Sequence, residues 1–181
     1  MASQQKFTLT VPEGYDEDSR RTIGEEAIKV IIARSKAGKD KNGSKFAGYS
    51  ASYIDSFDFK LGGKSKGNVN LTLSNEMLNS LEIIETSKGE IVIGIPKDDI
   101  LNNAKAEGNI LGTYGQKSPI RGKARDFMGL SSKEKESILS KIPIKDKEED
   151  SDLFGDLLRS TASVSLADRF FPPTPGGSDE F

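Results

Sequence analysis

The sequence predicts an α+β fold in which a long N-terminal helix packs against a small, mainly antiparallel sheet. Residues 16–37 carry apolar side chains at helical spacing, among them Ile23, Ala27 and Ile31. Residues 81–86 and 90–95 are apolar runs on either side of a short Ser-Lys-Gly turn, and this pattern predicts a β-hairpin. One apolar stripe on a helix and one apolar face on a sheet favour packing of the two against each other.

The N-terminal half supplies further elements. Residues 7–11 alternate apolar and polar side chains up to Pro12, which suits a strand at the edge of the sheet. The helix 16–37 begins at acidic residues and ends before a glycine, as helices commonly do. Residues 69–73 alternate again and predict another strand of the sheet. Ser74 then precedes a short helical pattern and is expected to cap it.

Two further helices are expected in the C-terminal half. Residues 98–107 follow an acidic start and reach Gly108, which we expect to end that helix. Residues 132–142 follow the capping-box pattern Ser131-x-x-Glu134 and end at a proline. The core is expected to contain Ile23, Ala27, Ile31, Leu71, Leu73, Leu81, Ile91, Ile93, Leu101, Phe127, Ile138 and Ile142.

A glycine-rich connection, residues 108–130, joins these two helices and is called the central loop below. Its four glycines before residue 123 and Pro119 exclude one regular element. It also carries large apolar side chains, which indicate a loop held by docking. We expect Phe127 and Met128 to lie under the final helix and to anchor the loop. The polar, glycine-rich segment 38–67 is a second long loop, and loops of this length are usually functional.

The composition argues against most catalytic designs. The chain has no cysteine and no histidine, which excludes disulfides, thiolate nucleophiles, imidazole bases and the usual zinc sites. A phosphate-binding loop at residues 38–45 fails, because Ser44 precedes Lys45 instead of following it. The acidic pair Asp98–Asp99 suits a helix start, and the run 148–150 suits a solvated linker. We expect no enzymatic activity, no catalytic residue, no cofactor and no metal.

Charge divides the chain into a body, residues 1–144, and an acidic arm, residues 145–181. The arm combines a charge run with two apolar clusters and a Pro-rich end, a pattern typical of a segment that docks on a neighbouring subunit or on an adjoining ring. The alternative is a terminal element that packs on its own core. No apolar run is long enough to span a membrane, and the N-terminus lacks the apolar centre of a signal peptide. The candidate interface residues are Arg34, Lys36, Lys39, Lys41, Lys45, Phe46, Tyr49, Tyr53, Arg121, Lys123, Arg125, Leu153, Phe154, Leu157, Leu158, Phe170 and Phe171.

Several phrases, in order, resemble the virion-morphogenesis, or tail-completion, family of neck proteins of tailed bacteriophages. They cover about residues 16–143: Gly38–Phe46 after an amphipathic helix, Tyr49–Tyr53, Val69–Leu81, Ile91–Gly94, and Gly115 ahead of a basic loop. The most specific is Arg-Asp-Phe-Met-Gly-Leu-Ser at residues 125–131, which is similar to the phrase that the family places before its final helix. Where many members have a histidine-containing phrase, this chain has Gly112-Thr-Tyr-Gly115, so nothing tied to that histidine carries over.

The resemblance implies a structural virion protein without catalytic residues, assembled in the host cytoplasm into a ring between the head portal and the tail. Its partners would be copies of itself, the adjoining portal-side connector and tail proteins, with weak contact to DNA in the channel. An alternative from the residues themselves is a nucleic-acid-binding module. The basic residues 34–45 beside Phe46, Tyr49 and Tyr53 combine the charges and aromatic rings that bind phosphates and stack on bases.

Overall fold

The computed structural model of this chain describes residues 3–67, 69–71, 75–114, 119 and 122–144. The chain divides into two units, residues 1–145 and 146–181. The predicted arm, residues 145–181, lies outside the described residues.

A three-stranded antiparallel sheet forms one layer of the fold, as predicted. Its strands are β1 (Lys6–Thr10), β2 (Glu82–Thr86) and β3 (Glu90–Gly94), in the spatial order β1-β3-β2. Lys6 and Glu82 both lie opposite Gly94, so the central strand β3 pairs along its length with both neighbours. The hairpin of β2 and β3 and the edge position of β1 confirm the sequence-based predictions.

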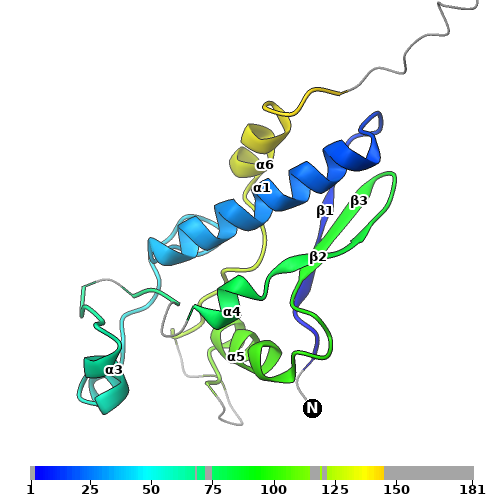
Figure 1. The fold of residues 1–181 in the computed structure, drawn as a ribbon. Helices are drawn as coiled ribbons and strands as arrows, with labels where there is room; N and C mark the ends of the chain where they lie inside the picture. Colours follow the sequence, from blue (N-terminus) through cyan, green and yellow to red (C-terminus); the bar gives the residue numbers. More distant parts are fainter. Residues whose placement is uncertain (1–2, 68, 72–74, 115–118, 120–121, 145–181) are drawn as a thin grey trace, which may run out of the picture. The chain divides into compact units, whose positions relative to one another are not determined.

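The long helix α1 (Glu17–Lys36) lies against this sheet and contacts β2 and β3 (Figure 1). Asp16 caps it by accepting a hydrogen bond from the backbone N–H of Ser19 at 2.7 Å. Gly24 allows the close approach, because a Cβ atom at this position would lie 2.6 Å from the Cδ1 atom of Ile83. The α+β class and the helix predicted at 16–37 are therefore confirmed.

Helix α6 (Ser132–Leu139) packs along α1 (Figure 1). Its first turn holds the predicted capping box, in which the Ser131 hydroxyl accepts from the N–H of Glu134 and the Glu134 carboxylate accepts from the N–H of Ser131. Ile138 joins the cluster under the sheet. The helix ends at Leu139, three residues earlier than predicted, and Ile142 is only partly buried.

A second cluster lies around α1, α4 (Glu76–Asn79) and α5 (Ile100–Leu111). Phe127 is fully buried in this cluster, whereas the α6 residue Ile138 belongs to the first. Phe127 and Met128 were both predicted under the final helix as the anchor of the loop; both are buried, but they belong to the second cluster and not to that of Ile138 on α6.

Two predictions about α5 were wrong. The helix does not end at Gly108, which is buried inside it, but at Gly112 in the left-handed region (φ 72°). A Cβ atom at Gly112 would lie 2.8 Å from the backbone nitrogen of Ala124, so the returning loop requires glycine there. Leu101, predicted in the core, is 64% exposed, because α5 turns Asn103 inward to bond Gln5, Pro96 and Asp99.

The strand predicted at 69–73 is absent from its described residues, 69–71. Val69 and Leu71 are buried as their alternation suggested, but the backbone N–H and C=O of Asn70 bond the hydroxyl of Tyr49 at 3.2 and 3.1 Å instead of a neighbouring strand. Leu73 and Ser74 lie outside the described residues. Asn75, with φ 59°, occupies the position before α4 and makes no side-chain capping bond.

The segment 38–67 contains two short helices that the sequence analysis missed, α2 (Ala51–Ile54) and α3 (Phe57–Leu61) (Figure 1). Ser50 and Ser56 cap them through their hydroxyl groups. Phe59 is buried, whereas Phe57 and Leu61 are 72% and 70% exposed. One turn of helix is too short to produce a readable apolar period, and that explains the omission.

Candidate functional site: an aromatic and cationic pocket

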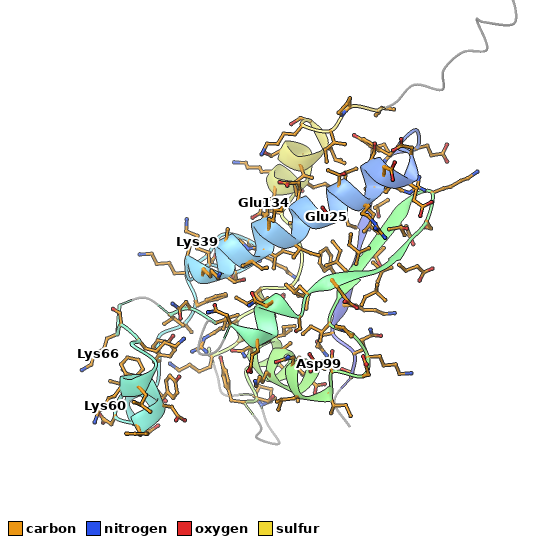
Figure 2. The ribbon with its side chains drawn as sticks, viewed as in Figure 1. Glu25, Lys39, Lys60, Lys66, Asp99 and Glu134 are labelled. Carbon is orange, nitrogen blue, oxygen red and sulfur yellow. The ribbon has the colours of Figure 1, made fainter. Side chains whose placement is uncertain are left out.

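The first predicted interface residue, Arg34, lies inside the protein at the end of α1. Its guanidinium donates to the carbonyl oxygens of Phe127 and Gly129 at 2.7 and 2.8 Å and to the Glu134 carboxylate at 2.6 Å. Figure 2 shows Glu134 on α6 beside α1. Burial acts to raise the pKa of Glu134, but hydrogen bonds from Ser131 and the Arg34 charge outweigh it and hold that pKa below its ordinary value. Arg34 therefore joins α1, the central loop and α6.

The other basic residues of 34–45 do not form one surface with their aromatic neighbours. Lys41 forms an ion pair with Asp126 at 2.7 Å, and Phe46 is buried in the second cluster. Lys36, Lys39 and Lys45 are exposed, with Lys39 at the end of α1 (Figure 2). The structure thus separates exposed lysines from residues that hold the fold together.

Four other predicted residues do come together. Tyr49, Tyr53, Lys123 and Arg125 line one pocket of about 520 Å³. This volume lies within the range of about 300–1,000 Å³ that is usual for ligand sites. Arg121 and the arm candidates Leu153, Phe154, Leu157, Leu158, Phe170 and Phe171 lie outside the described residues.

The aromatic side of the pocket is built by tyrosines from two distant segments. The Tyr49 ring lies 5.2 Å from that of Tyr53 and 5.4 Å from that of Phe59, centroid to centroid, in tilted and edge-to-face geometry. The Tyr49 hydroxyl is fixed by the main chain of Asn70, and the Tyr114 hydroxyl donates to the carbonyl oxygen of Lys123. The rings are therefore held in place before any ligand arrives.

Arg125 lies between two of these rings and is 8% exposed. Its guanidinium carbon is 5.3 Å from the centroid of Tyr49 and 5.1 Å from that of Tyr114, within cation–π range of both. The nearest neutral acceptor is Asn109 Oδ1, at 3.4 Å from Nη1, and the buried Nε atom has no partner among the described residues. A cation so enclosed, and without a carboxylate within ion-pair distance among the described residues, favours an anionic ligand.

Three lysines complete the cationic side. Lys64 donates to Asn70 Oδ1 at 2.7 Å and Lys123 to the carbonyl oxygen of Gly48 at 2.6 Å, so neutral acceptors hold both. Lys105 forms an ion pair with Glu76 at 3.2 Å. Burial, and next the charge of Arg125, lower the pKa of Lys64 from its ordinary value. The described residues that line the pocket include no aspartate or glutamate.

The aromatic hydroxyls report the same environment. Burial, followed by the influence of Tyr49 and Asp58, raises the pKa of Tyr53. Burial also raises the pKa of Tyr114, while Arg125 opposes that shift. Both tyrosines are therefore neutral hydrogen-bonding groups near neutral pH, and they offer no negative charge to the cations.

The central loop positions this site by docking on several parts of the body. The N–H of Arg125 donates to the carbonyl oxygen of Asn109 on α5 at 2.7 Å, and that of Lys41 donates to the carbonyl oxygen of Asp126 at 2.8 Å. The sequence predicts a docked loop here, and Tyr114 is one of its large side chains. Lys64, Lys105, Asn70 and Asn109 were not predicted, because these residues are far apart in the sequence and carry no motif.

The described residues contain no cluster of three or more acidic side chains placed to bind a metal ion. None of their helices is both long and apolar enough to cross a membrane. No protein-family model matches the chain, and no curated protein or solved structure matches it. The resemblance to phage neck proteins therefore rests on the phrases of the sequence itself.

Proposed function

We propose that this chain is a structural virion protein of a tailed bacteriophage, a ring-forming neck subunit that joins the portal-side connector to the tail. The observation that carries the proposal is the phrase Arg125–Ser131, the most specific part of the resemblance. Phe127 of this phrase is fully buried, and the carbonyl oxygens of Phe127 and Gly129 both bind Arg34. These contacts fix the course of the backbone at residues 125–131. Proteins with the same fold would need similar residues there, so the resemblance at this phrase supports a shared fold.

The chemistry of the pocket supports a role in binding. General acid–base catalysis needs a titratable group that is able to exchange a proton near neutral pH. The chain lacks histidine and cysteine, and the described lining offers lysines, an arginine and tyrosines. Cations beside rigid aromatic rings instead recognise an anionic group that carries an apolar part. We therefore place the protein among assembly components rather than enzymes.

In this proposal the protein is assembled in the host cytoplasm and remains in the neck of the virion. Each copy contacts its two neighbours in the ring, the connector on the portal side and the tail on the other side. A head-to-tail contact repeated around a closed ring uses two different surfaces of each copy. DNA passing through the channel would touch the exposed lysines Lys36, Lys39 and Lys45 only weakly.

The test is to locate the protein and count its copies. Mass spectrometry of purified virions should detect the chain, and a cryo-EM map of the neck should place its α+β body in a ring. Native mass spectrometry of the free protein should show multimers at assembly concentrations. Absence of the chain from virions would refute the proposed function.

The alternative function, nucleic-acid binding through residues 34–45, has one supporting observation, the exposed Lys36, Lys39 and Lys45 at one end of α1. Binding of this kind falls steeply with salt concentration. Fluorescence anisotropy with labelled single strands and duplexes at about 50 mM salt would detect it. No binding under these conditions removes the alternative.

A further inference from the structure

The two parts of the chain carry opposite net charge. Residues 1–144 contain 22 lysines and arginines against 19 acidic residues, whereas residues 145–181 contain four against nine. The described lining of the pocket holds four cations and no carboxylate, and Lys64, Lys123 and Arg125 form no ion pair with a described residue. Complementary potentials of this kind steer association and select partners.

One stretch of the arm matches the pocket in more than charge. Residues 148–158 read Glu-Glu-Asp-Ser-Asp-Leu-Phe-Gly-Asp-Leu-Leu, so that Phe154 stands between Asp152 and Asp156. The pocket likewise combines cations with tyrosine rings and with the apolar side chains of Leu71 and Met77. An aromatic anchor flanked by carboxylates is the peptide chemistry that such a site recognises.

We propose that the pocket of one copy binds segment 148–158 of a second copy, with Phe154 against the tyrosines and the Asp152 and Asp156 carboxylates facing the pocket cations. The ring context of this contact rests on the proposed function. In a ring, the arm of each copy would reach the pocket of the next, so the contact is heterologous and repeats until the ring closes.

The unpaired cations explain why a carboxylate stabilises this site. Lys64 and Arg125 line the same pocket, and burial first and then the charge of Arg125 lower the pKa of Lys64. Tyrosine rings limit the access of water to the Arg125 guanidinium. A carboxylate between Lys64 and Arg125 would accept charge-assisted hydrogen bonds and offset their like charges. Burial of Phe154 would supply most of the affinity, because partly exposed ion pairs contribute little.

The pocket fits a peptide better than a nucleic-acid strand. A strand needs a row of exposed cations along its phosphates. Here Arg125 is 8% exposed, and Lys64 and Lys123 are held by acceptors at the pocket. The acidic arm would also compete with any other polyanion for the same cations.

The composition of the chain allows a direct assay. Because the chain has no tryptophan, Phe154→Trp gives the full-length protein a single tryptophan in the proposed anchor. Its emission should shift to shorter wavelength as protein concentration rises, in parallel with the mass measured by sedimentation. Added Lys64→Glu and Lys123→Glu should weaken this association by about tenfold or more, because they place like charges opposite the arm.

A charge exchange separates docking between copies from docking within one copy. One variant carries Lys64→Glu with Lys123→Glu, and the other carries Asp152→Lys with Asp156→Lys. Each alone should fail to associate, whereas an equal mixture should associate again, because each pocket then meets a complementary arm. This rescue is available only between copies.

The matched control reverses Lys60 and Lys66 to glutamate. Both residues lie near α3 and outside the pocket lining (Figure 2), so this variant should associate like the parent. Loss of the Lys64 bond to Asn70 and of the Lys123 bond to Gly48 should lower the urea midpoint of the pocket variant. Urea unfolding of all variants should show that each is still folded under the conditions of the association assay, so that a loss of association is not a loss of folding.

Three outcomes would overturn the inference. Association unaffected by the pocket reversals excludes the pocket as the site. If a single chain that carries all four changes recovers the tryptophan shift with no rise in mass, while the mixture shows no recovery, the pocket is assigned to the arm of the same copy. Displacement of the tryptophan signal by an oligonucleotide but not by a peptide of sequence 148–158 assigns the pocket to nucleic acid.

The same experiments separate this inference from the proposed function. If the wild-type protein forms rings in virions but the charge-exchange mixture does not associate, the inference fails and the proposed function stands. If the mixture associates but the protein is not incorporated into virions, the proposed function fails and the inference stands.

Discussion

The sheet side of the body and the pocket side are built by different means. On the sheet side, α1 covers β2 and β3, and the cluster of Ile23, Ala27, Ile91 and Ile93 is fully buried between regular elements. On the pocket side, short helices and loops are joined by side chains that bond to the main chain of distant segments. Tyr49 bonds Asn70, for example, and Lys123 bonds Gly48.

This difference shows how a site can be rigid without regular secondary structure. On the sheet side, backbone polar groups pair in ladders and helices, and burial of apolar side chains provides the stability. On the pocket side, Arg34 alone satisfies two loop carbonyl oxygens and a carboxylate. Because Arg34 makes three such bonds at once, we expect its substitution to have an effect close to that of a core truncation.

The largest expected effect is that of Phe127→Ala. Phe127 is fully buried in the second cluster, the one around α1, α4 and α5. Its truncation therefore leaves a cavity and should lower the free energy of unfolding by about 3–5 kcal/mol. Urea unfolding followed by circular dichroism measures this change. Phe57→Ala, at a residue that is 72% exposed, is the matched control and should change little. Equal effects of the two substitutions would mean that Phe127 does not anchor the loop.

Arg34→Ala should rank second. The substitution leaves the carbonyl oxygens of Phe127 and Gly129 without their donor and removes the partner of Glu134. Loss of a buried donor to several acceptors should cost about 2–4 kcal/mol. Urea unfolding measures the loss, and hydrogen exchange should show faster exchange at the loop 122–131 than at β3. Lys39→Ala, at an exposed residue of the same helix end, is the control, and a matching loss there would argue against the role of Arg34.

The sequence predicted the sheet side far better than the pocket side, for a physical reason. The period of Ile23, Ala27 and Ile31 and the hairpin pattern depend on neighbours in the chain, and both were found where they were expected. Val69 and Leu71 are buried, as their alternation with polar residues predicts. The segment is nevertheless not a strand, because the Tyr49 hydroxyl bonds the backbone of Asn70. A bond across 21 residues leaves no local pattern.

The candidate site was predicted in part for the same reason. Tyr49, Tyr53, Lys123 and Arg125 were named because basic and aromatic residues stand near one another in the sequence, and they meet in one pocket. Arg34 and Phe46 shared that local pattern but do not line the pocket, since Arg34 bonds the main chain of Phe127 and Gly129 and Phe46 packs in the second cluster. Composition marks residues that are able to bind a partner, whereas only the packing decides which of them reach the pocket.

A smaller effect should come from Tyr49→Phe, which removes one hydroxyl and keeps the ring. The N–H of Asn70 would lose the Tyr49 hydroxyl as acceptor, and its C=O would keep only the longer bond of 3.5 Å from Lys64. This should lower the free energy of unfolding by about 0.5–1.5 kcal/mol. Thermal unfolding measures the shift. Tyr15→Phe is a matched comparison on the sheet side, where the hydroxyl donates one bond of 3.3 Å to the carbonyl oxygen of Leu139. If Tyr15→Phe costs as much or more, side-chain bonds matter no more on the pocket side than on the sheet side.

The smallest expected effect concerns Glu134 and its dependence on pH. Its pKa in the folded protein is lowered, so its ionised form contributes stability above the ordinary value of 4.5, and this contribution is lost as pH falls through the folded pKa. Glu134→Gln keeps a side chain suited to the capping box but removes the charge facing Arg34. The variant should be less stable than the parent at pH 7, by under about 1 kcal/mol because the pair is partly exposed, and the difference should shrink as pH falls below 4.5. Urea unfolding at pH 7 and at a series of pH values below 4.5 measures it. Glu26→Gln is the control, since the pKa of Glu26 is also lowered by its hydrogen bond to Lys29 but the pair is on the surface. A pH-independent difference for Glu134→Gln, or an equal pH dependence for Glu26→Gln, would show that the ion pair with Arg34 does not join α6 to the loop.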